Sequence, residues 1–475
     1  MTTALLLIAS GRSFFVSPTG NDLANGRSPR HAWRSLERAS REDYLPGDWI
    51  NLRSGAVFAG TLTLSKGGTR SRPVIIRSVG KPATIESPKA SAITLRCGGI
   101  VVENLLLRGR AHGKIGGHHG VFLLGRPGKQ ANAVLIDKLD ISGFGSDGIA
   151  MATPKGGLGG FDRVRIRHVH VHGNFGAGIT TEDGISYAGK GYSHHDLRIS
   201  DCDLSGNYDG TGMVLSGVDG ATVEFCRATN NVGKAGALGM WAWCARNVTF
   251  RYCIAGGTRG KSDSGGFDLD GGSVACTVEH CLSFDNDGPG YMHCDYPFAP
   301  RTHDNVMRDS VSVNDGRRPG GNAVGFGFVV WGSGLYHCSI KRNLAVCTED
   351  GPRGNSNGLL FATFIRDDKE PLPAQRLEAG LFQDNVVEIA GTSAVFMADN
   401  FAQNEQIRFV GNSFRSKLNP PFVEGQHAFK SVEEWHKATG KETGKPTTLT
   451  GASALGDYRN LRPRDLPRFF RRLGR

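Results

Sequence analysis

The feature that most constrains this chain is a repeat of short strand-like segments that begins near Asn104 and continues almost to the end of the sequence. Each unit has an apolar, alternating segment, one small or polar residue, a second short segment and a turn. The units are VVENLLLRG, LRISDCDLSGN, TVEFCRATNN, VTFRYCIAGG, TVEHCLSFDN, NVMRDSVSVN, SIKRNLAVC, LFQDNVVEIAG and IRFVGNSF. Repeats of roughly 20–50 residues built from strands predict a β-solenoid, in which each coil buries its apolar face only by stacking on the next.

One position of the repeat is always small or polar. It is occupied by Asn104, Cys202, Cys226, Cys253, Cys281, Ser310, Asn343, Asn385 and Asn412. From Cys202 to Asn343 the successive spacings are 24, 27, 28, 29 and 33 residues. The regular spacing places these residues in one column along the stack, with neighbours separated by about one strand spacing of ~4.8 Å.

A further strand in each unit begins with glycine, as in GIAM, GITT, GMVL, GMWAW, GFDLD, GYMHC, GFVVW and GLLF. Glycine makes up 67 of the 475 residues, about twice the usual ~7%, which is typical of a chain with many tight turns. No helical period occurs between Leu45 and Ser431. We therefore predict an all-β parallel β-helix of about ten coils.

The repeat resembles that of the right-handed parallel β-helix superfamily, of pectate-lyase-like architecture, and the resemblance covers roughly residues 14–425. The segments FFVSPTGND, AWRSLERA, LPGDWINL and RPVIIRSVG look like the beginning of secreted β-helix enzymes that act on polysaccharides. Family members commonly carry a stacked asparagine ladder, and Asn104, Asn343, Asn385 and Asn412 match it, while cysteines fill its middle. Lyases, hydrolases, epimerases and phage tailspikes share this architecture, so the resemblance implies the fold more strongly than the reaction.

The two ends of the chain differ from the repeat. Residues 1–13 contain a brief apolar run and are interpreted as a possible remnant of a signal peptide, which favours a secreted or periplasmic protein. A short amphipathic helix is predicted at 31–41, covering one end of the solenoid. Residues 426–475 are predicted to form a helical cap, starting at the capping box of Ser431, and a basic tail.

The net charge is +11, which favours anionic partners. We expect a polysaccharide or oligosaccharide ligand, possibly anionic. The sequence contains no recognised nucleic-acid-binding motif and no apolar run long enough to span a membrane, so neither partner is expected. We also expect a monomer.

The ten cysteines are consistent with either disulfides or packing. Cys202, Cys226, Cys253 and Cys281 fall in one column of the repeat, where small buried residues would stack. We favour packing, and the absence of a CxxC pair argues against zinc.

The segment GFDLD carries the strongest chemical signal. Alternate side chains of a strand point to opposite faces, so Phe267 and Leu269 face the core while Asp268 and Asp270 face outward. Two like charges at ~7 Å are unfavourable for stability. Acid–base chemistry gives them a use, and we predict that they form a catalytic pair.

The next segment, GYMHCDY, has two possible registers. If Met292 and Cys294 face inward, then Tyr291, His293 and Asp295 point outward beside the aspartate pair. The opposite register would bury His293, which is costly, so we predict the first. His293 and Asp295 thus join the predicted catalytic residues.

Three tryptophans are predicted to line the adjoining groove. In GMWAW and GFVVW the alternation turns Trp241, Trp243 and Trp331 outward, where indole rings can pack on sugar C–H faces. Tyr291 and Lys261 complete the predicted substrate-binding set. The alternative is that some of these rings pack under loops.

Metal sites are weaker candidates. Asp285 and Asp287 lie in a DNDG turn, which could supply oxygen ligands to calcium but needs no function, so no cofactor is assigned, with calcium left possible. His168, His170 and His172 alternate along a strand and could hold a transition metal, with a solvated face as the default.

Three function hypotheses remain open. The first is a glycoside hydrolase that uses the paired aspartates, with a ~7 Å separation in the range typical of inversion. The second is a polysaccharide lyase or epimerase acting on a uronate, possibly calcium-dependent. The third is a non-catalytic β-helix that binds glycans.

Overall fold

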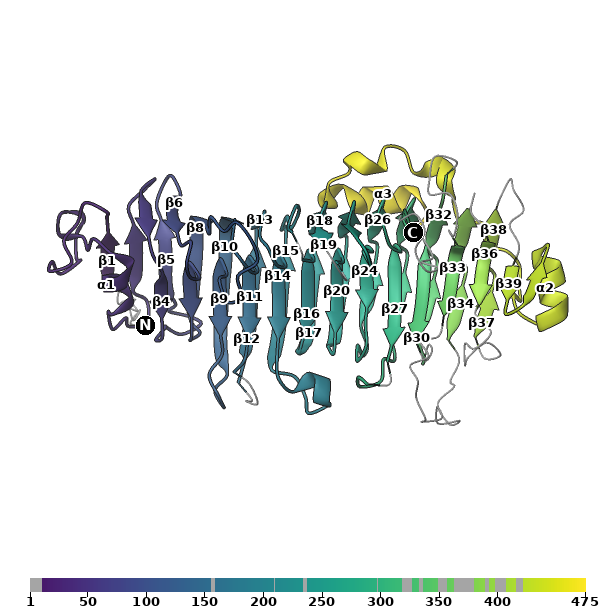
Figure 1. The fold of residues 1–475 in the computed structure, drawn as a ribbon, viewed down its shortest axis with the longest axis horizontal. Coiled ribbons are helices and arrows are strands. Elements are labelled where there is room, and N and C mark those ends of the chain that lie inside the picture. The colour runs from purple at the N-terminus through teal and green to yellow at the C-terminus, as the bar shows by residue number, and fades with distance from the viewer. Residues whose placement is uncertain are drawn as a thin grey trace, which may run out of the picture.

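The structure, a computed structural model, is an elongated solenoid whose coils stack along the long axis (Figure 1). It describes residues 11–154, 159–208, 210–233, 237–296, 298–317, 327–332, 336–348, 357–362, 380–388, 393–397, 407–415 and 422–475. Three sheets of parallel strands run along the stack around an apolar core, so the predicted all-β parallel β-helix is confirmed. Residues 1–10 of the possible signal-peptide remnant lie outside the described residues.

The first sheet has seventeen strands: β1 (Ser13–Val16), β2 (Trp49–Leu52), β3 (Val57–Ala59), β5 (Val74–Ser78), β6 (Ala83–Glu86), β8 (Ile100–Arg108), β10 (Ala131–Ser142), β12 (Phe161–Arg167), β13 (His170–His172), β15 (His194–Ser200), β17 (Val218–Glu224), β21 (Arg246–Arg251), β25 (Thr277–Glu279), β28 (Val306–Arg308), β31 (Ser339–Lys341), β34 (Leu381–Gln383) and β37 (Arg408–Val410).

The second sheet has fourteen: β4 (Leu62–Leu64), β7 (Ile93–Leu95), β9 (Val121–Leu124), β11 (Ile149–Ala152), β14 (Ile179–Glu182), β16 (Met213–Ser216), β20 (Met240–Trp243), β24 (Phe267–Leu269), β27 (Tyr291–Asp295), β30 (Phe328–Gly332), β33 (Asn357–Ala362), β36 (Ser393–Met397), β39 (Phe422–Glu424) and β40 (His427–Phe429). Among these strands only β40 is antiparallel to its neighbour. Each of the other strands belongs to a different coil, so the solenoid has more coils than the ten predicted.

The third sheet has seven: β18 (Arg227–Thr229), β22 (Ile254–Gly256), β26 (Leu282–Phe284), β29 (Val311–Val313), β32 (Leu344–Val346), β35 (Val386–Glu388) and β38 (Ser413–Arg415). A separate two-stranded sheet contains β19 (Val232–Gly233) and β23 (Arg259–Gly260), which follow β18 and β22 in the chain.

One coil takes one strand from each sheet in turn, as in β24, β25 and β26, after which β27 begins the next coil. The glycine before each second-sheet strand lets neighbouring coils approach closely. A Cβ on Gly266 would lie 2.6 Å from the carbonyl oxygen of Gly290 and 2.2 Å from the Ser283 hydroxyl. The recurring glycine is therefore a packing requirement of the sharp corner.

The repeat column predicted from the spacing is present from Cys202 onward, but Asn104 lies one residue away from it, because the register aligns Leu105 with Cys202. Cys202, Cys226, Cys253 and Cys281 are all buried, at no more than 2% exposed, and Ser310 follows them in the stack. All ten cysteines are free thiols, as the packing interpretation predicted. Their thiol hydrogens point to backbone carbonyls, so each coil satisfies its polar group locally.

An asparagine ladder continues the column. The Asn343 side chain donates to Asn385 over 3.1 Å, and Asn385 donates to Asn412 over 2.9 Å. Asn412 in turn donates to the Glu442 carboxylate over 2.8 Å, which ends the ladder. Each amide satisfies a backbone N–H of the preceding coil, as in the bond from the Asn343 N–H to Asn385, so the ladder stabilises the turns.

The four stacked cysteines should resist labelling in the native protein. They are fully buried, and burial raises the thiol pKa of Cys202, Cys226 and Cys253 well above the usual value, so little thiolate exists at neutral pH. Mass spectrometry after brief alkylation should find them modified only once denaturant is added. Rapid native modification of all four would contradict the stacked arrangement.

Each end of the described solenoid has a helix. At the start, the helix α1 (Leu36–Ser40) is shorter than the predicted 31–41, because the Ser35 hydroxyl caps it and Trp33 instead packs on Phe14 in the core. At the other end, α2 (Val432–Thr439) begins after the predicted Ser431 cap and ends at Gly440. Trp435 of α2 packs on Phe422, covering the last coil.

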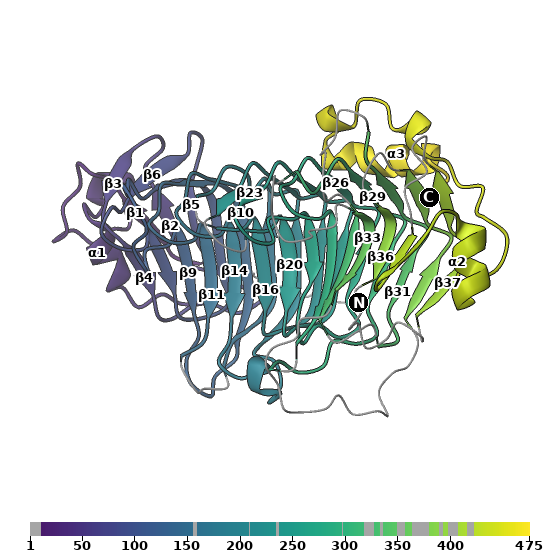
Figure 2. The same ribbon diagram turned by 45° about the vertical axis from the view of Figure 1, so that its right-hand side comes forward.

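The segment after α2 returns along the outside of the third sheet, shown in yellow in Figures 1 and 2. Its helix α3 (Leu466–Arg472) buries Leu466, Phe469 and Phe470 against that sheet. Arg464 pairs with Asp201 at 2.7 Å. These contacts dock the C-terminal segment on the solenoid. None of the described helices is long and apolar enough to cross a bilayer.

Candidate active site

The predicted site lies on the outer face of the second sheet, where β20, β24, β27 and β30 run side by side (Figures 1 and 2). Asp268 of β24 lies opposite Trp241 on one side and Met292 on the other. Phe267 and Leu269 are fully buried in the core. The alternation predicted for GFDLD is therefore correct, and Asp268 faces away from the core.

The two aspartates come together with a thiol. Oxygens of Asp268 and Asp270 and the sulfur of Cys294 all lie within 4.8 Å of one another. Asp268 is only 2% exposed and its Oδ1 has no hydrogen-bond partner, whereas Asp270 is partly exposed. The backbone N–H of Gly271 donates to Asp270 over 2.8 Å.

Burial strongly favours the protonated form of both acids. It raises the pKa of Asp268 well above its usual range, and the charges of Asp270 and Asp263 raise it further. Burial also raises the pKa of Asp270 to about 7, although the Gly271 N–H opposes this. At neutral pH the pair therefore holds at least one proton, as closely spaced carboxyl groups do.

The predicted register of GYMHCDY is wrong. Tyr291 and His293 lie opposite Phe267 and Leu269, so they face the core, whereas Met292 and Cys294 face outward beside the aspartates. The Tyr291 ring stacks between Phe267 and Phe328, with centroids 5.4 and 4.8 Å away. This aromatic column, and two carbonyl acceptors for the Tyr291 hydroxyl, stabilise the register that was rejected.

His293 and Asp295 are accordingly buried, at 1% and 2% exposed. The His293 Nε2 lies 3.1 Å from the Cys338 sulfur, and burial lowers the histidine pKa to about 4, so the ring is neutral. Asp295 accepts a hydrogen bond from the Thr302 N–H over 2.9 Å. Neither faces the outer surface that carries the aspartate pair.

All three predicted tryptophans do face outward. Trp241 and Trp331 pack with Met292 and Cys294 in a small apolar cluster beside the aspartates. Trp243 lies at the centre of an aromatic group that the sequence analysis missed. Its ring centroid is 6.1 Å from that of Tyr187, 6.2 Å from Tyr296 and 6.4 Å from Phe298.

The missed residues come from loops. Tyr187 is 50% exposed and Phe298 39% exposed, and each follows a second-sheet strand of a different coil. No periodicity marks such loop residues, so only the three-dimensional stacking reveals them. Cys294, by contrast, would have been found by choosing the other register.

Two charged residues precede β24. Asp263 is exposed and close enough for its charge to raise the pKa of both aspartates. Lys261, predicted to bind substrate, is exposed, and within the described residues its side chain makes no ion pair or hydrogen bond. No described contact connects Lys261 to the aspartate pair.

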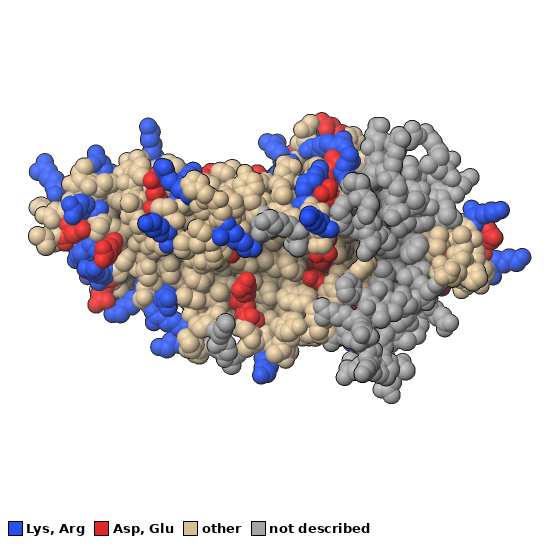
Figure 3. All heavy atoms as spheres, in the orientation of Figure 1, with Lys and Arg blue, Asp and Glu red and all other residues tan. Residues whose placement is uncertain are grey.

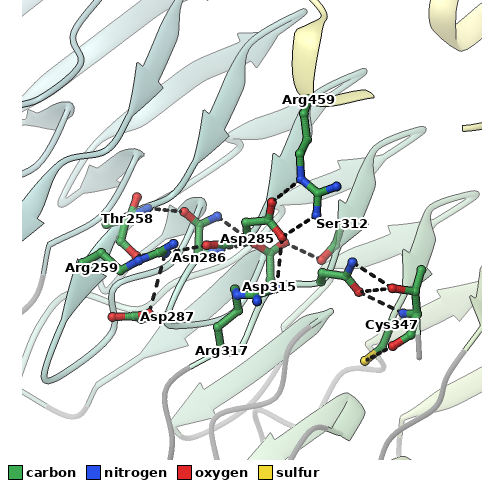
Figure 4. A network of polar contacts seen from close by, with 12 residues as sticks. Thr258, Arg259, Asp285, Asn286, Asp287, Ser312, Asp315, Arg317, Cys347 and Arg459 are labelled. Atoms are coloured by element: carbon green, nitrogen blue, oxygen red, sulfur yellow. Dashed lines mark hydrogen bonds and ion pairs between the residues drawn. The ribbon is translucent and has the colours of Figure 1, made fainter. Parts of the chain in front are cut away.

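The two weak calcium candidates are occupied by arginines (Figure 4). Asp285 pairs with Arg459 at 2.6 Å and with Arg317 at 3.2 Å. Asp287 lies 3.6 Å from Arg259 and accepts from the Gly260 N–H. Cations already neutralise both carboxylates, so the DNDG turn is a structural junction with the C-terminal segment.

The aspartate–cysteine group also fits calcium poorly. Calcium takes six to eight oxygen ligands, whereas this group offers two carboxylates and a soft sulfur. The predicted histidine row divides: His168 contacts Asp137 at 2.8 Å, while His170 and His172 both contact Asp140. Arg108 pairs with the same Asp140 at 2.7 Å, so these contacts form a surface ion-pair network.

Comparisons with known proteins agree with this architecture. Residues 183–360 match the family model described as right handed beta helix region. No curated protein sequence matches the chain. Among solved structures, a GH136 lacto-N-biosidase from Eubacterium ramulus is similar at 19% identity, with 74% of this chain and 68% of that chain covered and a TM-score of 0.56.

Two other solved structures show the range of proteins that share the fold. The A-module of a mannuronan C-5 epimerase from Azotobacter vinelandii is 15% identical, with 80% and 91% of the two chains covered and a TM-score of 0.50. The N-terminal fragment of the bacteriophage Phi29 gene product 12 is 12% identical, with 83% and 70% covered and a TM-score of 0.53. At such identities the likeness concerns the fold alone. The protein has the right-handed parallel β-helix architecture.

Proposed function

We propose that this protein is a carbohydrate-active enzyme that hydrolyses glycosidic bonds at Asp268 and Asp270. The observation that carries the proposal is the close carboxyl pair on an outward strand face, next to Trp241 of the neighbouring strand β20 and near Trp331 of β30, two strands away on the other side. The folds of a lacto-N-biosidase and a mannuronan C-5 epimerase support a carbohydrate substrate. Secretion or export to the periplasm would suit such a substrate.

The two carboxyl groups differ in a way that suits acid–base work. Asp268 is the more buried and keeps its proton at neutral pH, so it is the candidate general acid. Asp270 is partly exposed and has a pKa of about 7, so it is the candidate nucleophile or base. Pairs whose pKa values are pushed apart by their environment are typical of glycosidases.

The separation favours retention of configuration. One oxygen of Asp268 and one oxygen of Asp270 lie within 4.8 Å of each other. Inverting enzymes place their carboxyl groups roughly 6.5–9.5 Å apart to leave room for a water, whereas about 5–5.5 Å is typical of retaining enzymes. Direct attack by Asp270, forming a glycosyl ester that water then cleaves, fits this spacing.

A uronate lyase or epimerase remains the second candidate, because Asp270 could also act as a base. That chemistry needs a cation near the substrate carboxylate. The described residues place no arginine or lysine in contact with the pair, and the nearby donor set suits calcium poorly. A non-catalytic glycan-binding protein would leave the raised pKa values without a use.

The test is an activity screen of the purified protein on neutral and uronate-containing glycans, with and without EDTA. Reducing ends without an unsaturated product, resistant to EDTA, would support hydrolysis. NMR of the first product would report the anomeric configuration. Unsaturated products would favour the lyase, and glycan binding without turnover of any substrate would reject the enzyme proposal.

Replacing Tyr187 by Ala should weaken substrate binding more than catalysis. The ring is half exposed and stacks on Trp243, so it offers a sugar-sized surface at the edge of the site. We expect KM to rise about tenfold, the effect of roughly 1.4 kcal/mol, with kcat nearly unchanged. Tyr208→Ala is the control, since Tyr208 is 51% exposed and contacts Phe175 in a tilted ring pair outside the Trp243 group. Equal effects of the two changes would count against an aromatic platform.

A further inference from the structure

A second concentration of chemistry lies several coils away from the aspartates. A solvent-accessible cavity of about 690 Å³ is lined by six basic side chains and by no aspartate or glutamate. The basic residues are Lys66, Arg70, Arg96, Arg126, Lys129 and Arg163. In the face shown in Figure 3, lysine and arginine lie over the N-terminal coils with a few acidic residues among them, whereas the middle coils carry sparser charges of both signs.

Four of these six cations have no ion-pair partner among the described residues, and one of the four, Arg126, donates to the Ser65 carbonyl over 2.6 Å. Lys66 pairs with Asp43 at 2.7 Å and Arg163 with Asp162 at 2.9 Å. In the described parts of the chain, the side chains of Arg70, Arg96 and Lys129 make no ion pair or hydrogen bond. The side chains of Arg70, Arg96 and Lys129 are therefore free to bind an anion.

The stacking of coils brings these charges together. Lys66, Arg96 and Arg126 follow β4, β7 and β9, three successive strands of the second sheet, so they project from neighbouring coils. Like charges on neighbouring turns repel one another. A bound anion would relieve this repulsion, which gives the arrangement a use.

The basic cavity lies on the same edge of the sheet as the aspartates. Its turns follow the C-terminal ends of β4, β7 and β9, and Asp270 directly follows the end of β24. β24 lies five strands beyond β9 in the second sheet, a distance of about 24 Å at ~4.8 Å per strand.

We propose that the basic cavity binds carboxylate or sulfate groups of an acidic polysaccharide that is also the substrate of the aspartate pair. This inference rests on the proposed function and narrows its substrate to an anionic polymer several sugars long. Guanidinium groups suit such oxyanions because their N–H donors match them in pairs. Tyr44, the one aromatic side chain in the lining, is 4% exposed, so the cavity offers no stacking surface for nucleic-acid bases.

The experiment measures binding apart from turnover. The triple change Arg70→Ala, Arg96→Ala and Lys129→Ala is made in a protein that also carries Asp270→Asn, and calorimetry follows binding of long oligogalacturonate at several salt concentrations. We expect at least tenfold weaker binding and a shallower salt dependence than in the Asp270→Asn parent. Arg468→Ala, an exposed arginine on α3, is the matched control and should change neither.

Further probes separate the sources of the anion. Galacturonate monomer and inorganic phosphate should bind weakly, and an uncharged xylo-oligosaccharide should show no salt dependence. Equal binding of the triple variant and its parent would overturn the proposal, as would tighter binding of single-stranded DNA or of phosphate than of the oligogalacturonate. If the triple variant lost affinity as expected but the wild type cleaved no glycan, the cavity would stand and the proposed hydrolysis would fail. If the wild type cleaved neutral glycans and the triple change did not affect this cleavage, the proposed hydrolysis would stand and the inference about the cavity would fail.

Discussion

Replacing Asp270 by Asn is expected to lower kcat by about 10²–10⁴-fold while leaving the fold intact. Asp270 is the more accessible member of the pair, and its pKa of about 7 lets it be ionised in a useful fraction at neutral pH. An amide cannot attack the anomeric carbon or accept a proton. Because the change also removes repulsion between two close carboxyl groups, the free energy of unfolding should not fall.

The measurement is single-turnover kinetics on the best substrate from the screen, with circular dichroism to verify the fold. Asp457→Asn is a matched control, since Asp457 is exposed on the C-terminal segment. Asp268→Asn should also remove most activity if Asp268 is the general acid. Near-normal turnover in both Asp268→Asn and Asp270→Asn would reject the site.

The pH profile provides an independent readout. If Asp270 must be ionised, turnover should rise as pH increases through about 7. The charge of Asp263 helps to raise the pKa of both aspartates, so Asp263→Asn should move this limb to lower pH. Loss of kcat at every pH would instead place Asp263 among the groups that take part in the reaction.

The fold was predictable because every coil repeats the same constraints. Small residues must stack in one column, glycine must stand at one corner, and apolar residues must alternate. The burial of Cys253 and the outward direction of Asp268 both follow from these local rules. The site residues were predictable only where one of these local rules applied to them.

The register of β27 shows where the rules conflict. Both alternations in Tyr291–Asp295 contain apolar residues, so the cost of burying His293 decided the prediction. In the structure that cost is outweighed by the stack of Tyr291 between Phe267 and Phe328, two residues from other coils. A single strand's pattern does not contain that information.

The basic cavity was beyond the sequence for a similar reason. Lys66, Arg96 and Arg126 are about one coil apart in the chain, and each reads as an ordinary surface residue. The net charge of +11 indicated an anionic partner without indicating where it binds. Only the stacking of turns makes these separate cations into one surface.

Asp315 provides the largest expected effect on stability, and it belongs to a second polar ladder inside the solenoid (Figure 4). Asp315 is fully buried, and its Oδ1 accepts from the N–H and the side-chain amide of Asn286, at 3.0 and 2.7 Å. Its Oδ2 accepts from the Ser312 hydroxyl over 2.7 Å. Asn286 in turn accepts from the Thr258 N–H over 2.8 Å. Asp315 thus follows the side-chain amide of Asn286 in this ladder.

Burial raises the pKa of Asp315 to about 7 in spite of these hydrogen bonds. The unfolded chain has a pKa near ~3.9, so the folded state holds an extra proton between these values. Stability from this group is full below about pH 4 and is lost as pH rises through about 7. A shift of about three units corresponds to about 4 kcal/mol.

Replacing Asp315 by Asn should remove this loss of stability at high pH. The Asn oxygen can still accept from Asn286, and its amide can donate to the Ser312 hydroxyl, so the hydrogen bonds are kept without the charge. Urea unfolding at pH 4 should give similar free energies for the variant and the wild type, whereas at pH 8 the variant should be more stable by up to about 4 kcal/mol. Asp285→Asn, which removes the negative charge that pairs with Arg317 and Arg459, should instead be destabilising at pH 8. If Asp315→Asn were also destabilising at pH 8, the folded protein would need a charged carboxylate at this position, and the network would depend on a cation rather than on a retained proton.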